Sequence, residues 1–380
     1  MPDTLLATDN GDFDTVPWTR REIEQQPETL QATQTLLAAD RTGIEAFVAP
    51  LLARPDLRIV LTGAGTSAFA GECLAPWLSK LLDRCVEAVA TTDIVSAPLQ
   101  NLRRETPTLL VSFGRSGSSP ESVAAVDLVD AHVDEAYHLV ITCNAEGDLA
   151  QRSNANTKVV ILPEATHDRG FAMTSSFSAM MLAALSILGG IEALDARASA
   201  IAAAVSDSIA RAEPVIERLA RRNFKRVAYL GSGVFQGLAR EAALKMMELS
   251  DGAVVTCFDS ALGFRHGPKT IVNSETLVVV FVANDPLTRL YDLDIIEELR
   301  GDARCGEVVV ISAQPADGAE ITIAGMTQAA DVDLLFPFVV PAQLLGLRVS
   351  ELLGLTPDRP NASGTVNRVV QGVRIHATPA

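Results

Sequence analysis

The hydrophobic positions of the chain fall into short unbroken runs that occur twice. Three runs in the first half recur in the same order 168 to 170 residues later: 58–65 and 226–233, 108–113 and 276–281, 139–142 and 309–312. The first run of each set ends in Gly-x-Gly. Apolar runs without alternating polar positions are typical of parallel strands that helices cover on both faces. The pattern therefore predicts two copies of one α/β domain.

Segments of helical character, such as 119–133 and 287–300, separate the runs. We expect tandem domains, each a doubly wound, mostly parallel sheet flanked by helices. The predicted divisions are a flexible lead with N-terminal helices at 1–44, a first domain at 45–205 and a second at 213–376.

The start of the chain carries helix signals but no targeting signal. Residues 1–17 have neither a basic start nor an apolar stretch, which argues against a signal peptide. Thr19 and Glu22 match a capping box for a short helix that ends before Pro27. Pro27 in turn suits the first turn of a second helix that runs to about Leu37.

Three later segments allow specific predictions. Residues 171–191 carry no charge and are long enough to span a bilayer, but their hydroxyl residues favour a buried helix of a soluble protein. The Ala-rich stretch 193–213 predicts a linking helix that leads into Pro214. The two prolines of 336–341 predict a break before a last helix at 342–353.

Composition limits the partners. Forty-seven acidic residues against 31 basic ones give a net charge of −16, which disfavours binding to nucleic acid and to anionic membranes. Any bound phosphate must then be held by local donors. The five cysteines are scattered without a CxxC pair, which is typical of reduced thiols in a cytoplasmic protein and predicts no disulfide framework and no zinc site.

The first glycine loop reads Gly63-Ala-Gly65-Thr66-Ser67-Ala68. It matches the loose dinucleotide pattern G-x-G-x-x-A, a weak indication, and a nicotinamide site would require an acid such as Asp93. Hydroxyl groups beside the backbone amides of a helix start favour a phosphate-type ligand instead. A tight turn that only needs glycine is the structural alternative.

The second loop, 113–121, follows a strand and opens a helix. Its three serines, flexible glycines, helix-end amides and one arginine form a candidate anion cradle, although the serines of a capped helix can also simply face solvent. Ligands of open parallel sheets bind where adjacent strands end. We therefore predict a phosphorylated small molecule bound by Gly65, Thr66, Ser67, Arg115, Ser116, Ser118 and Ser119.

The second half contains candidate proton carriers. Glu241, Lys245 and Glu248 fall on one face of a helix, a pattern that usually marks a solvated row of ion pairs. Here the helix starts at a Gly-x-Gly turn, so a carboxylate held beside a lysine in a cleft is a plausible proton carrier. His266 precedes Gly-Pro at a turn, and an imidazole there could donate or accept a proton. The other histidines show no metal-ligand spacing, so we predict no metal site.

These residues resemble those of a known family. The sequence is similar to the sugar isomerase (SIS) domain family, in particular to double-SIS proteins related to the isomerase half of glucosamine-6-phosphate synthase. The likeness is greatest to the bacterial tagatose-6-phosphate ketose/aldose isomerases, also described as galactosamine-6-phosphate deaminases. It extends over 18–376, and its motifs lie at 20–27, 63–67, 112–122, 241–250, 265–269 and 364–373.

The resemblance implies roles for single residues. Thr66, Ser67, Ser116 and Ser119 match the phosphate loops; Glu248, paired with Lys245, matches the isomerising glutamate; and His266 matches a ring-opening histidine that can reach a neighbouring subunit's site. Two departures stand out. Gly114 replaces a serine of the second loop, and no lysine follows Lys269, since Gln371 lies near the position of the family's imine-forming lysine. The lead before the first copy is also too short for the synthase's glutaminase domain.

The resemblance therefore implies an enzyme that deaminates and isomerises an amino-sugar phosphate, in first place galactosamine 6-phosphate to tagatose 6-phosphate and ammonia, without a cofactor. A ketose/aldose isomerase of unaminated sugar phosphates and a non-catalytic sugar-phosphate sensor are the alternatives, and a nicotinamide dehydrogenase rests on the glycine loop alone. We also expect a cytoplasmic homodimer or larger homo-oligomer.

Overall fold

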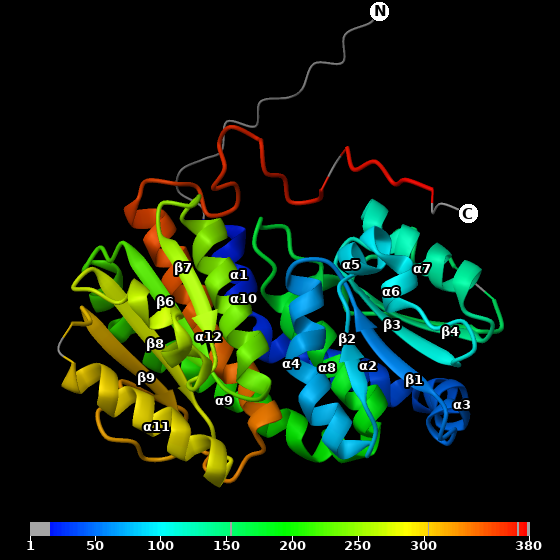
Figure 1. Ribbon diagram of the computed structural model, residues 1–380, viewed down its shortest axis with the longest axis horizontal. Coiled ribbons are helices and arrows are strands. Elements are labelled where there is room, and N and C mark those ends of the chain that lie inside the picture. The colour runs from blue at the N-terminus through cyan, green and yellow to red at the C-terminus, as the bar shows by residue number, and fades with distance from the viewer. Residues whose placement is uncertain (1–15, 153, 303, 371, 378–380) are drawn as a thin grey trace, which may run out of the picture.

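The computed structural model describes residues 16–152, 154–302, 304–370 and 372–377. Its core consists of two five-stranded sheets, parallel throughout, which Figure 1 shows on either side of central helices that include α4 and α10. The first sheet has the order β2-β1-β3-β4-β5, with β1 at Arg58–Thr62, β2 at Val86–Ala88, β3 at Thr108–Gly114, β4 at Ala136–Thr142 and β5 at Thr157–Ile161. The second has the order β10-β9-β8-β6-β7, with β6 at Arg226–Gly231, β7 at Val255–Asp259, β8 at Thr276–Val282, β9 at Glu307–Ser312 and β10 at Ile321–Thr322.

Helices precede, connect and follow these strands. Those of the first half are α1 Trp18–Glu24, α2 Gln26–Ala39, α3 Arg41–Leu52, α4 Thr66–Leu81, α5 Thr91–Ser96, α6 Pro98–Asn101, α7 Pro120–His132 and α8 Ser175–Gly189, with a 3₁₀ turn at Glu164–Thr166. Those of the second half are α9 Ile191–Ala220, α10 Val234–Leu249, α11 Pro286–Gly301 and α12 Asp331–Leu352, with 3₁₀ turns at Gly263–His266 and Pro268–Ile271.

The predicted repeat is confirmed. The three paired apolar runs form β1 and β6, β3 and β8, and β4 and β9. The glycine turns match as well, because Gly65 and Gly233 precede α4 and α10 with φ of +57° and +61°, a backbone region that favours glycine. The two copies thus share strand positions and the turn that directs the following helix.

The apolar helices lie in the interior. The uncharged segment 171–191 forms α8, whose residues from Ser175 to Leu188 are all buried, as predicted. Among the described helices, α12 alone has the length and apolarity that a membrane span would need. However, 89% of its most apolar window is buried within the protein, where it packs against α9 and α10.

The linking helix predicted at 193–213 is present as α9, which continues past Pro214. The break predicted at 336–341 was wrong, because α12 continues through Pro337 and Pro341. Because Pro341 has no N–H, the carbonyl of Pro337 lacks its helical donor, and the Ser208 hydroxyl of α9 donates to it instead at 2.7 Å. Packing of these buried helices outweighs the local preference of proline.

The predicted capping box was also wrong. Helix α1 begins after Pro17 without a side-chain cap. The Thr19 backbone N–H and hydroxyl both donate to the Asp358 carboxylate at 2.8 Å, and the Glu22 carboxylate accepts from the backbone of Gly170. Both side chains therefore join α1 to distant segments. Residues 1–15, predicted to be a polar lead, lie outside the described residues.

Candidate active site

A cavity of about 110 Å³ lies where β1 and β3 end. Residues of the two glycine loops form part of its wall, and the segment after α12 adds another part; the lining residues are Ala64, Ser67, Phe113, Gly114, Arg115, Ser116, Gly117, Ser119, Ser122, Met173, Arg368, Val369 and Val370. In Figure 1 this C-terminal segment, drawn in red, runs across the top of the molecule. The cavity is thus built from segments of the chain that lie far apart in sequence, from Ala64 to Val370.

The first loop presents one hydroxyl to this cavity and one away from it. Ser67, in the first turn of α4, is buried and lines the cavity. The Thr66 hydroxyl instead lies 3.3 Å from the Glu241 carboxylate of α10 and donates to it. Thr66 therefore connects the predicted phosphate loop to the second copy.

The second loop places its serines in three different environments. Ser119 caps α7, as predicted, because its hydroxyl accepts from the Ser122 amide, and it also lines the cavity. Ser116 lines the cavity as well, whereas the Ser118 hydroxyl accepts from the Asp148 amide at 3.0 Å. Within the described ranges, the backbone amides of Ser116, Gly117 and Ser119 have no hydrogen-bond acceptor. These amides are available to an anion.

Arg115 is buried, and its guanidinium donates to three backbone carbonyls. Nη1 donates to Gly170 and Phe171 at 3.3 and 3.2 Å, and Nη2 donates to Arg368 at 2.8 Å. Burial lowers the pKa of Arg115, and the neighbouring Arg368 adds to this effect. Arg115 thus braces the cavity wall, and contact between its guanidinium and a phosphate stays a prediction.

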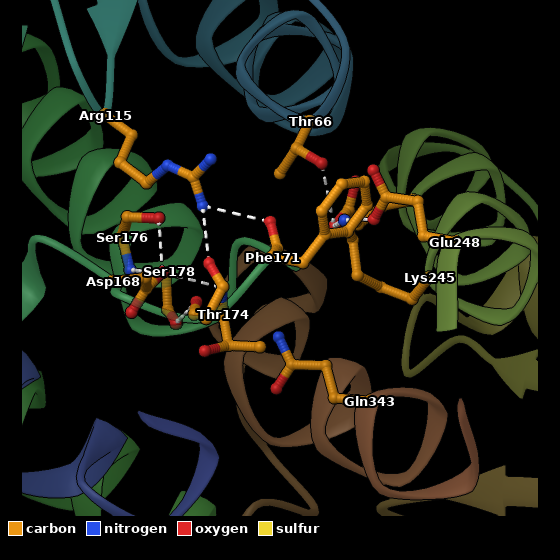
Figure 2. Close-up of polar contacts among 12 residues, drawn as sticks. Thr66, Arg115, Asp168, Phe171, Thr174, Ser176, Ser178, Lys245, Glu248 and Gln343 are labelled. Atoms are coloured by element: carbon orange, nitrogen blue, oxygen red, sulfur yellow. Dashed lines mark hydrogen bonds and ion pairs between the residues drawn. The ribbon is translucent and has the colours of Figure 1, made fainter. Parts of the chain in front are cut away.

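Three ionisable residues of α10 meet beside the first copy. The Lys245 ammonium has no exposed surface, forms an ion pair with Glu248, and lies 3.4 Å from Glu241. Figure 2 shows this pair across Phe171 from Arg115, with Thr66 above. The helical spacing was expected to mark solvated ion pairs or a cleft, and the structure shows burial, with Glu248 partly exposed.

Burial decides the charges of this group. It raises the pKa of Glu241 to about 8, although the Lys245 charge opposes the shift. Burial also lowers the pKa of Lys245, but the Glu241 and Glu248 carboxylates more than offset this and hold it above its ordinary value. Lys245 therefore remains an ammonium beside Glu248, and Glu241 is poised to carry a proton near neutral pH.

His266 lies elsewhere. It ends a 3₁₀ turn and is exposed, and no hydrogen bond or ion pair of its side chain occurs within the described part of the chain. The single chain therefore does not bring His266 to the cavity. Asp93 lies in α5, beyond the end of β2 at Ala88, rather than at the strand end where a nicotinamide ribose would require it.

Sequence reasoning missed the segment that supports Arg115. The Asp168 carboxylate accepts from the Thr174 and Ser176 amides at 2.8 and 2.9 Å and so caps α8, while its carbonyl accepts from Arg368. The Glu22 carboxylate accepts from the backbone amides of the next two residues, Arg169 and Gly170. The one local indication was a run of three hydroxyl residues before the uncharged helix; the contacts with Glu22 and Arg368 have no local pattern.

No group of three or more histidine, cysteine, aspartate or glutamate residues able to hold a metal ion occurs among the described residues. The donors around the cavity are serine hydroxyls and backbone amides near a helix start, an arrangement suited to an anionic ligand.

Comparison with known proteins agrees with this chemistry. Residues 51–188 match the SIS domain family. A Streptomyces coelicolor protein that carries the name AgaS is 49% identical over 99% of this chain and 98% of its own length. An Escherichia coli D-galactosamine-6-phosphate deaminase AgaS is 45% identical over 94% of this chain and 95% of its own. The chain belongs to the AgaS family of SIS proteins.

The AgaS-family fold is also known from solved structures. The tagatose-6-phosphate ketose/aldose isomerase of Escherichia coli superposes with a TM-score of 0.85 at 41% identity, over 97% of this chain and 99% of that one. The predicted resemblance and the α/β fold with two parallel sheets are therefore confirmed. The residues 51–188 that match the SIS family belong to the first copy of this AgaS-family chain, the copy that contains the cavity.

Proposed function

We propose that this enzyme converts galactosamine 6-phosphate and water to tagatose 6-phosphate and ammonia. The observation that carries the proposal is the position of the Lys245–Glu248 pair, which faces Arg115 of the cavity wall across Phe171, while Glu241 of the same helix accepts from Thr66 (Figure 2). The names of the 45%-identical deaminase and the 41%-identical isomerase support the same substrate class.

The cavity would bind the phosphate through the Ser67, Ser116 and Ser119 hydroxyls and the unpaired amides of the second loop. After ring opening, Glu248 removes the proton from carbon 2 to give an enolamine and returns a proton to carbon 1. The product is a ketimine at carbon 2, and water hydrolyses its C=N bond to the ketone and ammonia. A positioned base of this kind contributes roughly 10²–10⁴-fold to the rate.

Lys245 would serve this step by its charge. Its ammonium pairs with Glu248, the more exposed of its two acidic neighbours, and in this proposal it stabilises negative charge that develops on the open-chain oxygen once the substrate reaches that pair. The chain has no lysine after Lys269, so the proposed route forms no imine with an enzyme lysine of that region. Gln371, near the position of the family's lysine, lies outside the described residues.

We propose that ring opening requires a second subunit. His266 is exposed, and exposed apolar side chains of Phe258 and Leu262 lie close to it in sequence. Burial of this face in a homodimer would bring His266 toward the partner's cavity. A cytoplasmic, reducing location suits the five cysteines, all of which are free thiols.

The test is product formation from purified enzyme. Ammonia and ketose are measured with galactosamine, glucosamine and mannosamine 6-phosphates, and aldose formation is measured with tagatose 6-phosphate alone. We expect stoichiometric ammonia and ketose, greatest with galactosamine 6-phosphate. Isomerisation of tagatose 6-phosphate without ammonia from any amino sugar would instead establish the second candidate, the ketose/aldose isomerase that the 41%-identical structure is named for. Binding without turnover would indicate a sensor.

A further inference from the structure

The repeat builds a second pocket at the position that corresponds to the catalytic cavity. This pocket, of about 450 Å³, lies where the strands of the second sheet end. Trp77 and Lys80 of α4 line one side, and Gly233, Asp285 and Asp331 of the second copy line the other. The fold therefore offers two places per chain for a phosphorylated ligand, and the side chains of each place determine whether it binds one.

The α4 side of the second pocket, which corresponds to the α10 side in the first copy, has no acidic residue at the three matching positions. Helices α4 and α10 pack together and match over their full length at an offset of 168 residues. The positions that correspond to Glu241, Lys245 and Glu248 are occupied by Cys73, Trp77 and Lys80. The second pocket thus lacks a counterpart of the proposed base.

The strand-to-helix loops of the two copies also differ in length and in side-chain chemistry. In the first copy five residues, 115–119, connect β3 to α7, and three of them are serines. In the second copy three residues, 283–285, connect β8 to α11, and none carries a hydroxyl. The helix cap changes with them, from Ser119 to Asp285.

The backbone amides of the shorter loop are already occupied by the protein's own carboxylates. The three loop amides donate to two aspartates: Ala283 to Asp292 at 3.0 Å, and Asn284 and Asp285 to Asp331 at 2.6 and 3.4 Å. At the start of α11 the Leu287 and Thr288 amides donate to the cap Asp285 at 3.1 and 2.9 Å, as the Ser122 amide donates to Ser119 in the first copy. The matching amides of Ser116, Gly117 and Ser119 have no acceptor among the described residues. Carboxylates thus stand where the first copy leaves donors for an anion.

We infer that Asp285 and Asp331 close the second pocket to phosphate, so that each chain binds its phosphorylated ligand at one place. Two effects act together: Asp331 satisfies loop amides that would bind an anion, and the charges of Asp285 and Asp331 repel it. Asp292 is fully buried behind the loop, so Asp285 and Asp331 are the residues that face the pocket. The comparison rests on the proposed phosphate site of the first copy.

Stoichiometry of binding tests the inference. The full-length chain is titrated calorimetrically with glucitol 6-phosphate, an open-chain phosphate that cannot isomerise. The test variant is Asp285→Ser/Asp331→Asn, in which serine keeps a helix cap and asparagine keeps one acceptor for the Asn284 amide. The control is Asp294→Asn/Asp317→Asn, which makes the same change in net charge at exposed positions of the same copy. We expect one ligand per chain for wild type and control, and two for the test variant.

Each other result has a defined meaning. A test variant that keeps its circular dichroism spectrum and deaminase activity but still binds one ligand would overturn the inference, as would a wild type that binds two. If wild type binds none and the test variant binds one, the phosphate site proposed for the first copy is wrong, whereas the role of the two aspartates stands.

Discussion

A lysine without exposed surface lies between two acidic side chains of its own helix in this protein. Lys245 pairs with Glu248 on the side that reaches solvent and with Glu241 on the side that does not. The two acids are therefore unequal, since Glu241 is buried completely and Glu248 partly. This inequality favours Glu248 over Glu241 in the proposed role of base toward the substrate, while Glu241 contacts Lys245 and Thr66.

Replacing Glu248 tests this assignment. Glu248→Gln keeps the shape of the side chain but removes the base, so kcat should fall by roughly 10²–10⁴-fold with little change in KM. Ammonia release gives the measurement, and Glu297→Gln, at an exposed position of α11, is the matched control. Unchanged kcat in Glu248→Gln would show that another group moves the proton.

Glu22 makes stability depend on pH. Burial and the neighbouring Asp168 charge raise the pKa of this carboxyl to about 7 in the folded protein, against an ordinary value of 4.5. A raised carboxyl pKa stabilises the folded state at low pH, and this contribution is lost as the pH rises from about 4.5 through about 7. The shift corresponds to a loss on the order of 3 kcal/mol in the free energy of unfolding.

Urea unfolding between pH 5 and pH 8 measures this effect. Wild type should lose stability over that range, and Glu22→Gln should show a smaller loss, with Glu28→Gln, an exposed position of α2, unchanged from wild type. Asp292 and Glu241, whose pKa values are raised mainly by burial to about 6 and about 8, act in the same direction, so the slope is reduced rather than abolished. Equal slopes for Glu22→Gln and wild type would refute the assignment.

At the scale of elements, α9 and α12 show how a helix accommodates an internal proline. The Ser208 hydroxyl replaces the amide donor that Pro341 lacks. Ser208→Ala should leave the buried Pro337 carbonyl unpaired and lower the free energy of unfolding by about 1–3 kcal/mol. Ser206→Ala, at an exposed position of the same helix, should change it little. Similar losses in both variants would mean that the hydroxyl contact is unimportant.

The strands were predictable and several helix boundaries were not, for a physical reason. Strands such as β3 and β8 are buried on both faces, so the sequence shows continuous apolar runs. Pro337 and the pair Thr19 and Glu22 were misread because local rules omit partners distant in sequence, such as Ser208 and Asp358.

In the candidate site, the loop residues were predicted from the sequence and the long-range contacts were not. Ser67, Ser116 and Ser119 line the cavity as a loop pattern suggests, since they sit at strand ends. The bracing of Arg115 by Arg368 was not foreseen, because it joins residues 253 positions apart. Contacts of that kind arise from the tertiary fold alone.

At the scale of the whole molecule, the proposed function requires more than one chain. Each site would combine Glu248 of one subunit with His266 of its partner. Glu248→Gln and His266→Ala variants should then each lose activity alone. Purified hybrid dimers should regain about half of wild-type activity, because each holds one intact site of two, and the unsorted co-expressed mixture about a quarter, because about half of its dimers are hybrids. Ammonia release by the purified hybrids gives the measurement. Hybrids isolated by two different tags that remain inactive would place His266 in the same subunit's site, or in none.

The bond between Arg368 and Asp168 spans 200 residues. Domains generally fold in order during synthesis, so the first sheet of a growing chain can be complete while the wall supplied by residues 368–370 has yet to be made. Until then the serine loops lack this part of their wall, and a chain that ends before α10 also lacks Glu248, the proposed base. A product of interrupted translation would therefore retain a folded half that performs no chemistry, and activity would report the integrity of nearly the entire polypeptide.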